Sequence, residues 1–150
     1  METVIQLNSE AKLSEHFTLG EMTTSNHKEV YNIPSHEAIA NLKRLCGWLE
    51  VLRERAGTPI RINSGYRSPQ LNRKIGGAPT SNHLTGCAAD IRVSGMEQLI
   101  QYAAILIQYA NETHQEFDEL LLEKNRYGAI WLHFAVRPSG NRRKVLFLSV

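Results

Sequence analysis

Residues 64–93 read SGYRSPQLNRKIGGAPTSNHLTGCAADIRV, and this stretch joins a glycine-rich loop to an apolar strand. Gly76, Gly77 and Gly86 permit tight turns and close approach of the backbone. Residues 88–93 are mostly small or apolar, as in a buried strand. A polar cluster carried by a loop beside a rigid strand is a common design of binding and catalytic sites. The polar side chains of this stretch that suit such a site are Arg67, Ser81, His83 and Asp90.

The sequence before this stretch predicts one long amphipathic helix over residues 36–56. Ser35 is a typical N-cap, and Gly57 followed by Pro59 is a typical stop. The apolar positions recur at intervals of three and four: Ile39, Leu42, Leu45, Cys46, Leu49 and Leu52.

The sequence after it predicts one further helix and then strands. Ser94-Gly95-Met96-Glu97 matches a capping box, and the helix should run to about Asn111 with Met96 and Ile100 on its apolar face. Apolar and alternating segments at residues 119–123, 129–136 and 145–150 predict strands. Helices followed by strands with short connections indicate an α+β domain, with a mostly antiparallel sheet and helices packed on one side.

Composition limits the classes of function. The 150 residues suit a single domain, in which residues 1–12 form either a loose or a docked arm. A net charge of +2 does not favour a nucleic-acid partner, and no apolar stretch approaches a membrane span. The first 17 residues show no basic segment followed by an apolar one, so we expect a chain made in the cytoplasm that reaches any external target by release or export. Cys46 and Cys87 are expected to be free thiols.

Three residues have a spacing that suits a metal site. Asp90 lies seven residues after His83, and His133 lies 43 residues after Asp90 in another predicted strand. Two imidazoles and one carboxylate form a three-ligand zinc site with an open fourth position. A strand histidine is more often packed in a core, but a carboxylate in an apolar strand is costly unless it is paired or metal-bound. Spacing alone leaves both interpretations open, and it does not suit the closely spaced His and Asp of non-haem iron sites.

The motifs resemble those of the zinc D-alanyl-D-alanine carboxypeptidase family, which shares its fold with the hedgehog signalling domain. The matching segments are Ser64-Gly65-Tyr66-Arg67-Ser68-Pro69, Leu71-Asn72, Ile75-Gly76-Gly77, Ser81-x-His83-x-x-Gly86-x-Ala88-Ala89-Asp90-Ile91 and Trp131-x-His133. The resemblance covers about residues 13–136.

This resemblance assigns roles to individual residues. It implies one zinc ion per chain, bound by His83, Asp90 and His133. It implies that Arg67 stabilises negative charge on the substrate, where a guanidinium supplies a fixed positive charge. Ser81 and Tyr66 are expected to bind the substrate, although Ser81 is equally suited to capping its own loop.

The general base is the point at which this chain departs from several members of the family. They carry Asp or Glu three residues before the last histidine, where this chain has Ile130. Another branch carries FDxLxxE before the W-x-H strand, and Phe117–Glu123 matches it. We therefore expect Glu123 to be the base, with Asp118 as the second candidate.

The resemblance predicts a zinc metallopeptidase that cleaves peptidoglycan stem peptides at bonds involving D-amino acids, of a type found in phage endolysins. Ile130 leaves open a non-catalytic module of the same fold that binds zinc and either peptidoglycan or a protein. A cytoplasmic dipeptidase with the same chemistry is a third interpretation.

Overall fold

The computed structural model describes residues 8–150, so the first part of the predicted arm lies outside the described residues. The rest of the arm lies against α1 (Leu19–Met22). The backbone oxygens of Ser9 and Ala11 accept hydrogen bonds from Gly20 and Leu19 at 2.9 and 2.8 Å. Residues 9–11 are therefore docked. No helix among the described residues is long and apolar enough to cross a membrane.

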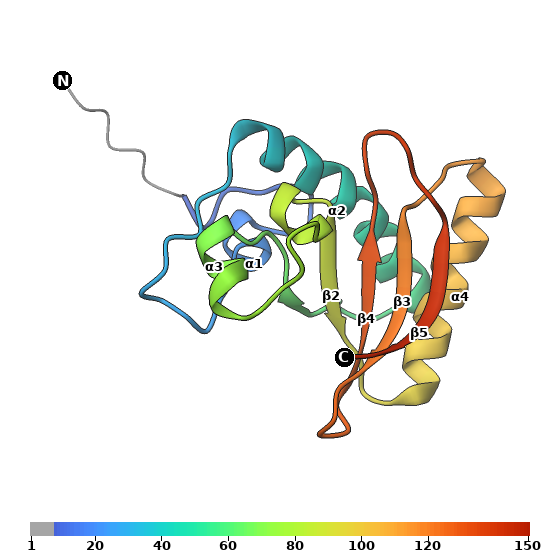
Figure 1. The fold of residues 1–150 in the computed structure, drawn as a ribbon. Coiled ribbons are helices and arrows are strands. Elements are labelled where there is room, and N and C mark those ends of the chain that lie inside the picture. The colour runs from blue at the N-terminus through green and yellow to red at the C-terminus, as the bar shows by residue number, and fades with distance from the viewer. Residues whose placement is uncertain (1–7) are drawn as a thin grey trace.

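A mixed five-stranded sheet in the order β1-β2-β4-β3-β5 forms the centre of the described domain (Figure 1). Its strands pair antiparallel except β3 and β5, which run parallel. The strands are β1 (Ile62–Ser64), β2 (Ala88–Arg92), β3 (Glu119–Lys124), β4 (Ile130–Ala135) and β5 (Lys144–Ser149). The predicted α+β class with a mostly antiparallel sheet is confirmed.

The long helices α2 (His36–Ala56) and α4 (Met96–Thr113) cover one face of this sheet (Figure 1). The bounds of α2 are those predicted, because its caps act as the sequence indicates: the Ser35 side chain accepts from the Ala38 N–H at 3.1 Å, and Gly57 has a φ of 69°. The apolar side of α2 packs on alternate strand residues, which include Ile91, Leu120, Leu132 and Phe134. Strand residues between these core positions point to the opposite face.

Two expectations about the second half of the chain are wrong. The predicted capping box before α4 does not form, because Gly95 is the N-cap and makes no side-chain cap bond. Met96 and Ile100 are exposed, so the buried stripe of α4 is narrower than its apolar stripe. At the edge of the sheet, every residue of β5 is exposed.

The glycine-rich loop carries α3 (Pro69–Lys74) and the short 3-10 helix η1 (Asn82–Thr85). Gly86 ends η1 with a φ of 76°, and a Cβ added there would lie 2.5 Å from the Ala38 oxygen of α2. This position therefore requires glycine both for its backbone conformation and for its close approach to α2. The turn at Gly86 leads the chain from η1 directly into β2.

Candidate metal centre

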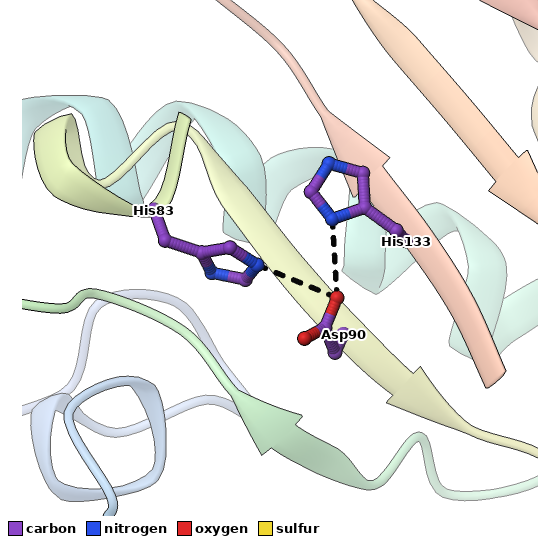
Figure 2. A group of neighbouring side chains, drawn as sticks. All are labelled: His83, Asp90 and His133. Atoms are coloured by element: carbon purple, nitrogen blue, oxygen red, sulfur yellow. Dashed lines mark hydrogen bonds and ion pairs between the residues drawn. The ribbon is translucent and has the colours of Figure 1, made fainter. Parts of the chain in front are cut away.

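The fold brings His83, Asp90 and His133 together on the face of the sheet opposite α2 and α4 (Figure 2). Asp90 and His133 are directly opposite each other on the antiparallel strands β2 and β4. His83 reaches them from η1, whose position is fixed by a 2.9 Å hydrogen bond from the Arg67 N–H to the His83 backbone oxygen. Strand pairing and one loop contact thus bring together His83 and His133, which are 50 positions apart in the sequence.

The ligand atoms of the three residues have the spacing of a zinc site. Asp90 Oδ1 lies 3.1 Å from His133 Nδ1 and 3.4 Å from His83 Nε2. All three ligand atoms lie within 4.8 Å of one another. Tetrahedral zinc with ligand bonds near 2.0–2.1 Å requires ligand atoms about 3.3 Å apart. Two imidazole nitrogens and one carboxylate oxygen at these separations therefore fit a three-ligand zinc centre.

Burial and mutual charge perturb every titratable group of this cluster. Burial lowers the pKa of His83, although Asp90 opposes that shift. Burial alone would lower the pKa of His133, but hydrogen bonds to Asp90 and Glu119 outweigh it and raise the pKa to about 9. Burial alone would raise the pKa of Asp90, but the two histidines hold it well below its usual value. Asp90 is therefore an ionised carboxylate, which is the form that binds a metal.

Glu123 lies beside the same cluster on β3. Its Oε1 is 3.6 Å from His133 Nδ1, and its residue is 9% exposed. Burial raises its pKa to about 7, and the carboxylates of Asp90 and Glu119 raise it while His133 opposes them. A carboxyl group with this pKa can accept and return a proton near neutral pH.

Strand geometry explains why position 130 holds an apolar residue. Ile130 packs against the core, like Leu132 and Phe134, because alternate residues of β4 point to the helices. Glu123 is paired across the strands with Trp131, two residues from His133, so it shares the face of His133. In this chain, β3 rather than β4 brings a carboxylate to the cluster.

The other residues predicted to contact the substrate, Arg67, Ser81 and Tyr66, lie in three different environments. Arg67 lies at the cluster, where its Nη2 is 3.3 Å from Asp90 Oδ2. Ser81 caps η1 by accepting from the His83 N–H at 3.2 Å, and it also lines the cleft described below. Tyr66 is 7% exposed and packs in the core, so the structure does not bring its side chain to that cleft.

Asp118, the second candidate for the base, has a structural role. Its side chain is fully buried and accepts hydrogen bonds from Arg142 at 2.8 and 3.0 Å and from Asn82 at 2.8 Å. Through its hydrogen bonds with Arg142, Asp118 fixes the position of the connection between β4 and β5. These contacts favour a structural role for Asp118 over the expected role as reserve base.

We expect Asp118→Asn to lower the free energy of unfolding by about 2–3 kcal/mol, because hydrogen bonds to a buried charged group are lost. The contacts with Arg142 lower the pKa of Asp118 from 3.8 to about 2, against the effect of burial. A lowered pKa stabilises the fold above pH 3.8, and this contribution is lost as the pH falls through about 2. Urea unfolding of parent and variant at neutral and at acid pH measures both effects.

Glu116→Gln is the matched control, because Glu116 pairs with Arg143 at 3.4 Å on the surface. A surface pair contributes about 0–1 kcal/mol. Equal destabilisation by the two substitutions would contradict the structural role of Asp118.

A cleft of about 770 Å³ lies over the cluster. Its polar lining residues include Arg67, Ser81, His83, Asp90, Glu119, Glu123, His133, Arg137, Arg142 and Lys144. Its apolar lining residues include Ile75, Leu121, Trp131, Leu148 and Val150. This volume is large enough for a short peptide segment rather than a single small ion.

Comparison with known families places this chain. The model of the family described as Peptidase M15 matches residues 15–125, which is more than half of the chain. The chain belongs to the peptidase M15 family. M15 peptidases are zinc-dependent, and the donor set of the cluster agrees with that metal. The match includes His83, Asp90 and Glu123 but ends before β4, so the position of His133 comes from the structure. A search of curated proteins found no match.

Proposed function

We propose that this M15 peptidase holds one zinc ion between His83, Asp90 and His133 and hydrolyses peptidoglycan stem peptides at a bond involving a D-amino acid. The observation that supports it most is the meeting of the three ligand side chains with Glu123 in one cleft. The resemblance of the S-x-H-x-x-G-x-A-x-D and W-x-H motifs to D-alanyl-D-alanine carboxypeptidases supports the choice of substrate.

The residues of the cleft divide the chemistry of peptide hydrolysis among them. Zinc held by the three ligands would activate water and polarise the scissile carbonyl. Glu123 accepts a proton from the attacking water at its carboxylate and returns it to the leaving amine. Arg67, held at the cluster by Asp90 and by Ser64 Oγ at 3.2 Å, supplies positive charge where the carbonyl oxygen becomes negative.

Positive charge on the cleft wall favours an acidic peptide as the substrate. Arg67, Arg137, Arg142 and Lys144 line it together. Stem peptides carry several carboxylates, including the one at their end, and guanidinium groups recognise carboxylates through paired hydrogen bonds. A wall-degrading activity of this kind also suits an endolysin role.

Incubation of the zinc-loaded protein with purified muropeptides, followed by mass spectrometry, tests the proposal. We expect a product shortened at one defined bond, and no product from the same peptide with an L-amino acid at that bond. Binding of muropeptides without turnover would favour the non-catalytic module instead. Cleavage of unrelated L-peptides at the same rate would contradict the substrate assignment. Clearing of permeabilised bacterial cells by the added protein tests the endolysin role separately.

Removal of the metal should lower the melting temperature. Zinc that binds the folded chain stabilises it by about 2.7 kcal/mol at a hundredfold excess over Kd, which for this size corresponds to roughly 5–10 °C. Calorimetry of the zinc-loaded protein with and without a chelator measures the shift. A melting temperature that does not respond to the chelator would contradict the zinc site.

A further inference from the structure

The two histidines of the metal centre are held in the same manner at their outer nitrogens. The inner nitrogens, His83 Nε2 and His133 Nδ1, face Asp90. The outer Nδ1 of His83 lies 2.7 Å from the backbone oxygen of Gly65. The outer Nε2 of His133 lies 3.0 Å from Glu119 Oε1. Both outer partners are acceptors, so with a metal on the inner side each outer nitrogen keeps its proton and each inner nitrogen offers its lone pair to the metal.

Glu119 is itself fixed in place. It begins β3 and is paired with Ala135 of β4, two residues beyond His133. The Asn82 side-chain amide donates to Glu119 Oε1 at 2.6 Å, and Arg142 Nη2 lies 3.5 Å from Oε2. Asn82 directly precedes His83, so one buried amide connects the η1 segment that carries one ligand to the carboxylate that contacts the other.

We propose that Glu119 is a positioning residue of the metal centre, which orients the His133 ring and fixes its tautomer so that Nδ1 binds zinc. This inference rests on the proposed function, because it concerns the same zinc site. The two carboxylates of β3 then have different roles, because they lie at opposite edges of the His133 imidazole. Glu123 lies near the inner nitrogen, 3.6 Å from Nδ1, whereas Glu119 contacts the outer nitrogen.

The geometry distinguishes this role from simple packing. A carboxylate that only packed at the start of β3 would need no ring nitrogen within hydrogen-bond distance, whereas Glu119 Oε1 lies 3.0 Å from His133 Nε2. Carboxylate partners of metal-binding histidines raise the basicity of the ligand as well as orient it, and their loss typically weakens metal binding about 10–100-fold.

Zinc affinity of Glu119→Ala, measured by competition with a chromophoric chelator, tests the inference. We expect Kd to rise about 10–100-fold. Glu119→Gln should recover most of that affinity, because its side-chain oxygen still accepts from Nε2–H. Glu97→Gln on the exposed start of α4 is the matched control and should leave Kd unchanged. In the ¹⁵N-histidine spectrum of the zinc-loaded parent, His133 should show a slowly exchanging Nε2–H that Glu119→Ala loses.

The outcomes distinguish the proposed function from the positioning role of Glu119. A parent that binds no zinc overturns the proposed function and this inference with it. A zinc affinity of Glu119→Ala equal to that of the parent overturns this inference alone. Equal losses in Glu119→Ala and Glu119→Gln would show that the charge of Glu119, and not its hydrogen bond, matters, and this would also overturn the positioning role. If Glu119→Ala does not fold, a Glu119→Gln variant with the Kd of the parent and an unprotected Nε2–H overturns the inference in its place, because the hydrogen bond is then lost without any effect on zinc binding.

Discussion

Glu123→Gln should keep zinc and the folded state while turnover of the stem peptide falls about 10²–10⁴-fold, the range that general acid–base catalysis supplies. The amide has nearly the shape of the carboxylate but cannot take a proton from water. Burial raises the pKa of Glu123 to about 7, so the parent side chain is suited to both accept and return a proton near neutral pH. Turnover, zinc content and melting temperature of parent and variant measure the three properties separately.

Glu37→Gln at the exposed start of α2 is the control, since it removes a carboxylate that does not line the cleft. Parent-like turnover by Glu123→Gln would exclude Glu123 as the base. Glu119 would then be the remaining β3 carboxylate of the cluster, because Asp118 is held by Arg142 and Asn82.

His83→Ala should reduce zinc from one per chain to nearly none and lower turnover by more than about 100-fold, the upper end of what changes to outer partners of a metal site cost. Removal of one of three protein ligands leaves Asp90 and His133, and catalytic zinc sites normally use three. The loss should be larger than that of Glu119→Ala, because His83 supplies a ligand atom and Glu119 only orients one. Metal analysis by mass spectrometry and the muropeptide assay measure the two effects.

His27→Ala is the control for His83→Ala. His27 lies outside the cleft and pairs with Glu29 at 3.4 Å. Zinc content that is unchanged in His83→Ala would contradict the ligand assignment. A loss of zinc in both variants would point to a general defect of metal loading rather than to the site.

Local sequence predicted the elements whose formation depends on near neighbours. The helix at residues 36–56 was predictable because Ser35, Gly57 and the apolar spacing between them all act within a few residues. Alternation in β4 was predictable for the same reason, and it correctly separates His133 from the core residues Leu132 and Phe134. The apolar periodicity of α4 was less informative. It gives the width of the apolar stripe on the helix, but not the width of the surface that packs against it.

The choice of carboxylates around the metal centre required the tertiary structure. The sequence presents Asp118, Glu119 and Glu123 as similar acidic residues of one segment. Pairing between strands brings Glu123 to the inner nitrogen of His133 and Glu119 to its outer one. The connection after β4 then buries Asp118 beneath Arg142.

By itself, the sequence determined which donor types are present and which of them share a face, since composition and alternation are local properties of the chain. It identified His83, Asp90 and His133 as a set that suits zinc. Only the tertiary structure decided which atoms meet. Strand register and the turn at Gly86 set distances between residues far apart in the chain, and a change of one position in register moves every side chain to the opposite face. For that reason the placement of Tyr66 in the core followed from packing and not from its motif.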